Sequence, residues 1–130
     1  MSNTVKAAVG SFIVGTALAL SVNLGVPNNP HASVRSPDWH KAEAAHLVRQ
    51  PKCACCGGTK KRQVHHIQPF HDKPELELDP NNMITLCTDG PCNLNCHFVI
   101  GHLGNTKCSN PNVVEDAAYM LSRFSSRKCD

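Results

Sequence analysis

The residues best suited to chemistry in this chain of 130 residues are its cysteines, all eight of which follow residue 52. Cys53 and Cys56 are separated by two residues, a spacing that lets two thiolates in one tight turn face the same ion. Cys87 and Cys96 lie on either side of a second turn, and two such pairs make a tetrahedral zinc site. The spacing therefore predicts one structural Zn²⁺, which would stabilise a domain with few large apolar side chains.

The other cysteines leave alternatives open. Cys55 lies inside the first pair, and Cys92 is a substitute for Cys96, which we prefer as the fourth ligand. Cys108 and Cys129 stand outside the arrangement, as free thiols or as a disulfide. If the domain is exported, a disulfide framework becomes the competing interpretation of these cysteines, because disulfides persist in oxidising compartments.

Two adjacent histidines, His65 and His66, lie at the end of a short apolar segment that is typical of a strand. Neighbouring side chains of a strand point to opposite faces, so one imidazole can bind a metal ion while the other faces a substrate. Asn82 and His97 follow downstream. An imidazole titrates near pH 6.5 when unperturbed, so such a histidine can accept a proton at neutral pH. A histidine pair by itself would more often be an incidental polar pair beside a zinc knuckle.

The order of the motifs adds to this interpretation. Four segments follow one another over residues 53–105: CACC, VHHIQPF, NNMITLC and NCHFVIGHLGN. Together they resemble the HNH endonuclease family, and a looser resemblance extends upstream into RSPDWHKAEAAHLVRQPKC. The resemblance implies an α+β fold, a small ββα-metal (treble-clef-like) domain with a four-cysteine zinc site and flanking helices. Two short strands and a helix would clasp a catalytic divalent ion, Mg²⁺, Mn²⁺, Ni²⁺ or Zn²⁺.

The resemblance also implies a role for each motif residue. His65 matches the first ligand of the catalytic ion, and His66 matches the general base that activates water. Asn82 matches the asparagine that braces the loop carrying the base. His97 matches the last metal-binding histidine, which projects from the helix.

A second helix histidine, His102, follows His97 by five residues instead of four. On an unbroken α-helix this spacing is off the face, because the helix turns once in 3.6 residues. If Gly101 ends or distorts the helix, His102 becomes a third ligand; otherwise it caps the helix end or contacts a phosphate. The nearby loop residues His71, Asp72, Glu75 and Glu77 are expected to be solvated.

The elements that must position these groups can be predicted from periodicity and turn residues. Ser36 is expected to cap a helix that continues to Arg49, with Pro37 at its first position. The other expected elements are strands at 63–67 and 83–86, a helix around 96–102 and a terminal helix at 114–123.

Residues 7–26 carry no charge and are mostly small and apolar. They predict an N-terminal apolar helix that serves as a membrane anchor or signal, with a disordered or peripheral tail as the alternative. The proline-containing stretch 25–37 suits a linker. We therefore expect residues 1–35 to form the apolar segment and linker, and residues 36–130 to form the nuclease domain. Its location is left open between membrane-anchored or exported and cytoplasmic.

Charge does not decide the function, because the formal net charge is only +3. Lys60, Lys61 and Arg62 form one short basic run, either a nucleic-acid contact or a solvated turn. The leading hypothesis is a metal-dependent endonuclease that hydrolyses DNA phosphodiester bonds, with sequence precision supplied by a partner protein. The alternatives are a non-catalytic zinc-knuckle module that binds nucleic acid and a secreted disulfide-rich protein.

Overall fold

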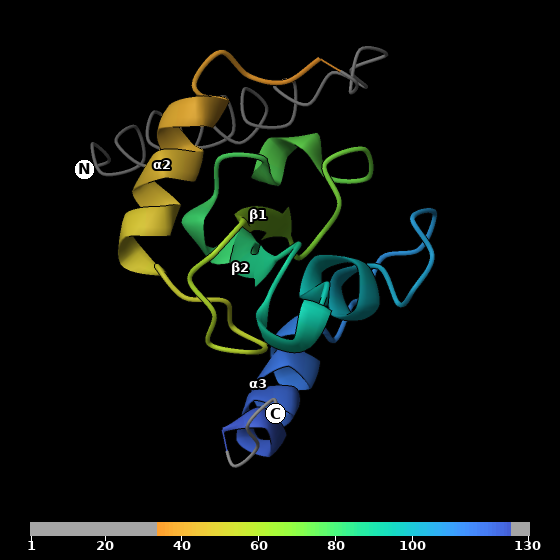
Figure 1. Ribbon diagram of the computed structural model, residues 1–130. Coiled ribbons are helices and arrows are strands. Elements are labelled where there is room, and N and C mark those ends of the chain that lie inside the picture. The colour runs from red at the N-terminus through yellow and green to blue at the C-terminus, as the bar shows by residue number, and fades with distance from the viewer. Residues whose placement is uncertain (1–33, 126–130) are drawn as a thin grey trace, which may run out of the picture. The chain divides into compact units, whose positions relative to one another are not determined.

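The computed structural model describes residues 34–125 and shows a small α+β domain (Figure 1). Its regular elements are helix α2 (Trp39–Arg49), strands β1 (Arg62–His66) and β2 (Met83–Cys87), and helix α3 (Val113–Phe124). Short helical turns lie between them, and the one at His97–Gly101, the histidine turn, bears on function. The apolar helix expected at residues 7–26 lies outside the described residues. Within residues 34–125, none of the helices has the length and apolar character required to span a membrane.

The two strands form one antiparallel sheet with five residue pairs, from Arg62 opposite Cys87 to His66 opposite Met83. This register places a cysteine at one end of the sheet and the paired histidines at the other. Strand β2 is buried along its whole length, whereas β1 is buried only at His65 and His66. The sheet therefore separates a cysteine end from a histidine end.

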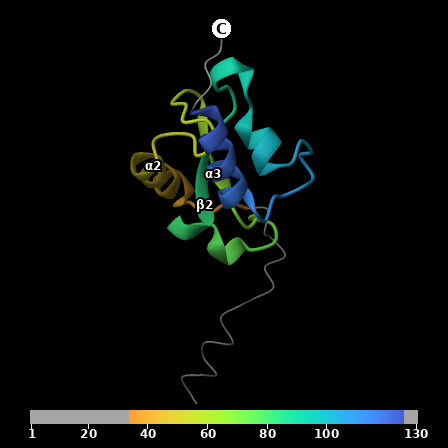
Figure 2. The same ribbon diagram turned by 90° about the horizontal axis from the view of Figure 1, so that it is seen from below.

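The core is small and contains the cysteines themselves. Its largest fully buried side chains include Leu86 and Val113, and Cys53 and Cys87 are packed among them. Helix α2 lies to the left of the sheet in both views, whereas α3 lies beneath it in Figure 1 and in front of it in Figure 2. A core of this size provides little hydrophobic stabilisation, which suits a domain that is held by a metal ion.

Most expected elements are present, with shifted ends. The strands expected at 63–67 and 83–86 run over Arg62–His66 and Met83–Cys87, and the terminal helix extends by one residue at each end. Helix α2 begins at Trp39 and not beside Ser36, which forms a turn ahead of it: the Ser36 carbonyl accepts a hydrogen bond from the Trp39 N–H (3.0 Å). The helix expected around 96–102 is a five-residue π-helix.

Candidate functional site

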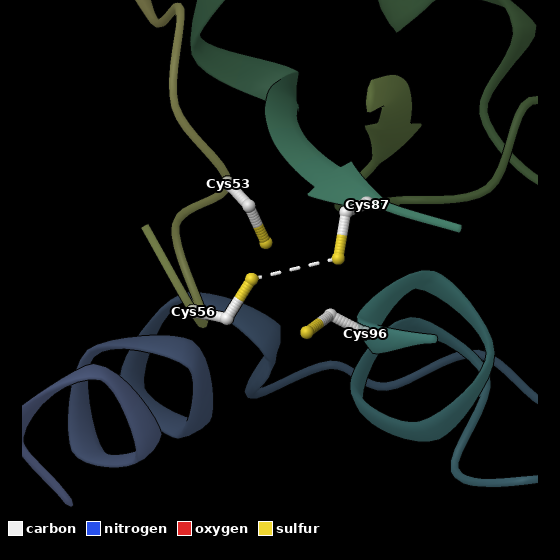
Figure 3. A group of neighbouring side chains, drawn as sticks. All are labelled: Cys53, Cys56, Cys87 and Cys96. Atoms are coloured by element: carbon white, nitrogen blue, oxygen red, sulfur yellow. Dashed lines mark hydrogen bonds between the residues drawn. The ribbon is translucent and has the colours of Figure 1, made fainter. Parts of the chain in front are cut away.

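Four cysteines converge at one end of the sheet (Figure 3). Their sulfur atoms all lie within 4.8 Å of one another, and we call this group the cysteine cluster: Cys53, Cys56, Cys87 and Cys96. The first two come from the turn before β1, the third ends β2 and the fourth precedes the histidine turn. These are the four residues that the spacing selects.

Backbone contacts fix the turn that carries the first pair. The Cys53 N–H donates to the Gly58 carbonyl and the Gly57 N–H donates to the Cys53 carbonyl, both at 2.8 Å. The Ala54 N–H donates to the carbonyl of Thr85 in β2 (2.9 Å), which ties the turn to the sheet. Gly57 has a φ of 72°, a left-handed conformation that favours glycine.

Gly90 closes the other side of the cysteine cluster. A Cβ at this position would lie 2.6 Å from the Cys87 sulfur and 3.1 Å from the Cys56 sulfur. Any larger residue would therefore displace the sulfur atoms, so the loop after β2 is shaped around them.

The thiols of the cluster share protons unequally. The pKa of Cys53 is lowered to about 4, mainly because the Cys96 thiol donates a hydrogen bond to it. The same contact and a similar one to Cys55 raise the pKa of Cys96. Burial raises the pKa of Cys56 to about 12. Four thiolates this close repel one another strongly unless a cation lies between them, so the donor set fits Zn²⁺, which prefers such ligands.

The remaining described cysteines do not join the cluster. Cys55 is buried and contacts the Cys96 thiol, but its sulfur is not among the four that lie mutually within 4.8 Å. Cys108 is exposed and has a free thiol. The side chain of Cys92 and the whole of Cys129 fall outside what the structure describes.

Three imidazoles meet at the other end of the sheet, and we call them the three-histidine group: His65, His97 and His102. Their donor nitrogens all lie within 4.8 Å of one another. The ring centroids are 5.0 to 5.1 Å apart, and the rings are inclined at 74° to 89°. The Nε2 atom of His65 is buried and has no hydrogen-bond partner among the described residues. An unpaired buried nitrogen is costly, so the arrangement fits a bound metal ion.

The histidine turn explains how His102 reaches this group. On an α-helix, residues five apart diverge by about 140° around the axis. The segment His97–Gly101 is instead a π-helix, in which hydrogen bonds join residues five apart, so that His97 and His102 lie on one side. The chain then leaves through Leu103, which has a φ of 52°. Of the two alternatives that the sequence left open, a distorted helix near Gly101 is therefore the one present.

Gly101 is also required by the close packing of the turn on β1. A Cβ at this position would lie 3.0 Å from Cε1 and 3.1 Å from Nδ1 of His65. The absence of a side chain thus lets the turn approach the His65 ring face.

Two imidazoles of the group, those of His65 and His97, have lowered pKa values that favour the neutral form. Burial, followed by the proximity of His97, His102 and His66, lowers the pKa of His65 to about 4. Burial, followed by the proximity of His102, lowers the pKa of His97. A neutral imidazole has a free lone pair, which is the form that binds a metal ion.

His66 lies apart from the three-histidine group and has its own partners. Its Nε2 lies 2.9 Å from the backbone carbonyl oxygen of Glu77, and its ring centroid lies 4.7 Å from that of Trp39. Because a carbonyl only accepts, Nε2 carries the hydrogen and donates a hydrogen bond to the Glu77 carbonyl oxygen. In this tautomer Nδ1 is the nitrogen that can accept a proton.

Asn82 lies directly before β2 and is buried. Its side-chain oxygen accepts from the Gln68 N–H (2.7 Å), and its Nδ2 donates to the carbonyls of Gln68 (3.0 Å) and Leu76 (3.3 Å). One amide side chain thus ties together both ends of the loop between the strands. Glu77, whose carbonyl is the partner of His66, lies within this loop.

A cavity of about 600 Å³ brings these groups onto one surface. His65, His97 and His102 line it together with His66. Its wall also includes two aromatic rings and two cationic side chains: Trp39, Phe70, Arg35 and Lys107.

The basic run does not line this cavity. Lys60, Lys61 and Arg62 lie at the cysteine end of the sheet, where Lys61 pairs with Asp89 (2.9 Å) and Arg62 donates to the Pro51 carbonyl. A nucleic-acid contact at these residues therefore remains a prediction that has no geometric link to the histidines.

Sequence reasoning missed Arg35 and misjudged Glu77. Glu77 was expected to be solvated, but it is only 5% exposed, and its Oε2 accepts from the Ser36 N–H (3.0 Å). The nearby residues His71, Asp72 and Glu75 are exposed, as expected. The lead-in segment did hold a signal for Arg35, because this arginine precedes the tryptophan Trp39 by four residues and arginine binds over aromatic faces.

Residues 53–98 match the family model described as HNH endonuclease. This match confirms the resemblance seen in the cysteine and histidine segments, and it ends before His102. No curated protein and no solved structure matches the chain.

Proposed function

We propose that this protein, whose residues 53–98 match the HNH endonuclease family, is a metal-dependent endonuclease that hydrolyses DNA phosphodiester bonds with His66 as general base. One observation carries the proposal: His66 and the three-histidine group line the same cavity. Hydrolysis of a phosphodiester requires an activated water and a cation near the scissile phosphate, and the two sets of imidazoles are suited to these separate tasks.

His66 supplies the basic nitrogen. Because its Nε2–H is engaged by the Glu77 carbonyl, a water molecule in the cavity would transfer its proton to Nδ1. The resulting imidazolium keeps its hydrogen bond to Glu77, which stabilises the developing positive charge. The Trp39 ring packed against the imidazole limits its rotation. Asn82 would position the base indirectly, through the loop that presents Glu77.

His65, His97 and His102 would hold the catalytic divalent ion, so that the two strands and the histidine turn form a ββα-metal unit. When bound, the ion acts as a Lewis acid that stabilises negative charge on the phosphate and on the leaving oxygen. Three imidazole nitrogen donors favour Zn²⁺, Ni²⁺ or similar ions over Mg²⁺, which prefers oxygen ligands. All three histidines line the cavity, through which a substrate would reach the ion.

The cysteine cluster would hold a structural Zn²⁺ and would take no part in the chemistry. It lies at the far end of the five-residue strands from His66 and is largely buried. Its role is to join the turn before β1, the end of β2 and the histidine turn. Bound there, the ion would hold in place the elements that carry the imidazoles.

The test is plasmid cleavage by the full chain across a series of Mg²⁺, Mn²⁺, Ni²⁺ and Zn²⁺. The change of His66 to alanine should lower the rate by about 10²- to 10⁴-fold, the usual contribution of a general base. His40→Ala is the matched control, because His40 is 92% exposed and lies outside the cavity. Zinc content and circular dichroism should be unchanged in both variants.

Equal cleavage by wild type and the His66 variant would remove the proposed mechanism. Wild-type protein that binds DNA but cuts it with none of these ions, while a known nuclease does so under the same conditions, would favour the non-catalytic binding module instead.

A further inference from the structure

We propose that Arg35 is a phosphate-binding residue for the DNA strand that enters the histidine cavity. The proposal deepens the proposed function and rests on it for the identity of the ligand. Arg35 lies ahead of α2, outside the matched segment 53–98, yet its side chain lines the cavity with His66.

Two aromatic rings hold the guanidinium group in place. The Arg35 Cζ lies 4.3 Å from the centroid of the Trp39 ring and 5.4 Å from that of the Phe70 ring. Stacking of this kind uses the faces of the planar group and leaves the N–H donors at its edge. Trp39 is the same residue that packs on His66, so the cation and the proposed base are positioned by one side chain.

The N–H donors of Arg35 are largely unused. Within residues 34–125 its nearest anionic partner is Glu77, whose Oε1 lies 3.6 Å from Nη1, too far for a good hydrogen bond. The Arg35 side chain is 47% exposed, whereas that of Glu77 is 6% exposed. Arg35 therefore balances a buried carboxylate and still presents donors to the cavity.

Glu77 connects this cation to the proposed base. Its carboxylate holds the chain at Ser36 and faces Arg35, while its backbone carbonyl accepts from His66. A phosphate bound at Arg35 would therefore lie beside His66.

The cavity wall carries as many cations as carboxylates, so an anionic ligand would have to be held by directed donors and not by net charge. Lys107 lines the cavity in the loop that follows His102. The two carboxylates of the wall have histidine partners: Glu43 lies 3.7 Å from His40, and Asp72 lies 3.4 Å from His71. A planar fork matches the oxygen geometry of a phosphodiester, so Arg35 suits this ligand better than a simple charge would.

The experiment measures binding of a short fluorescein-labelled DNA duplex to the full chain by anisotropy, without an added catalytic ion. Arg35→Ala should weaken binding about tenfold, in line with the loss of one charge-assisted phosphate contact. The logarithmic salt dependence should become shallower by about 0.9, the value for one phosphate. Arg49→Ala is the matched control, since Arg49 is exposed at the end of α2 and lies outside the cavity. It should bind within about twofold of wild type.

Since Arg35→Ala leaves Glu77 without its cation, a second variant protects the test against misfolding. Arg35→Met with Glu77→Gln removes both charges, keeps the net charge and retains an acceptor for the Ser36 N–H. This double variant should still bind about fivefold more weakly than wild type, because the directional donors are lost.

Wild-type affinity in the double variant would overturn the role of Arg35, and so would equal losses in Arg35→Ala and Arg49→Ala. Both results are independent of cleavage. An inactive wild type that shows the expected loss in Arg35→Ala would instead contradict the proposed hydrolysis alone.

Discussion

The Nε2 atom of His66 lies 2.9 Å from the backbone carbonyl oxygen of Glu77, so the end of β1 is joined to the loop ahead of β2. Asn82 braces this loop through Gln68 and Leu76. The orientation of the proposed base therefore depends on a residue that does not touch it.

Replacing the buried Asn82 by alanine should destabilise the domain by about 2–3 kcal/mol, because the backbone groups of Gln68 and Leu76 lose the partner of three part-buried hydrogen bonds. Urea unfolding measures this loss. The cleavage rate of the folded fraction should also fall. Asn81→Ala is the control, because Asn81 is exposed and only its backbone N–H is bonded, to Asp79. Similar unfolding midpoints for both variants would show that Asn82 does not brace the loop.

Gly101→Ala should weaken binding at the three-histidine group, because the new Cβ would lie 3.0 Å from the His65 ring. The expected loss is about tenfold in affinity for Ni²⁺ or Zn²⁺, the lower range for residues that orient metal ligands. Titration calorimetry on protein with its cysteine site filled measures it. Val99→Ala, an exposed change in the same turn, should bind as wild type does. Unaltered affinity in Gly101→Ala would mean that His65 can shift freely or is not a ligand.

Removing a cysteine of the cluster should abolish zinc binding and folding together. In Cys53→Ala, the thin core cannot replace the roughly 10–16 kcal/mol that structural zinc supplies in small peptides. Native mass spectrometry and circular dichroism measure zinc and structure. Cys108→Ala should keep both, because that thiol is exposed and outside the cluster. A folded, zinc-bound Cys53→Ala protein would exclude the proposed ligand set.

Acid should destabilise the protein when the three-histidine group has no bound ion. The folded pKa of His65 is about 4 and its ordinary value is 6.5, so the unfolded chain binds the proton more readily. This contribution to stability is complete above pH 6.5 and is lost as the pH falls through 4. Urea unfolding of wild type and His65→Leu measures it. The difference between their free energies of unfolding should change within this window; a constant difference would contradict the shift.

The cysteine and histidine spacings predicted much of what the structure brings together. The turn at Cys53 and the two strands could be predicted from local sequence alone, because the turn residues and the apolar runs that form them are contiguous. Whether His102 lies close to His65 and His97 could not be predicted. A π-helix differs from an α-helix by one inserted residue, and sequence periodicity does not reveal that insertion.

The pairing of Arg35 with Glu77 escaped prediction for a different reason. Their contact joins residues 42 positions apart, and a buried carboxylate in a polar loop looks like a solvated one. Only tertiary packing distinguishes the two.

The register of the sheet has a consequence for how the protein would be supplied with metals. Cys87 and His65 lie in different residue pairs of the sheet, with two pairs between them, so the strands connect the thiol end to the imidazole end. We expect an order of loading: a chain that has not acquired its first ion cannot align the nitrogens for the second. Scarcity of zinc during synthesis would then leave the cell with inactive chains, whatever the supply of the second ion.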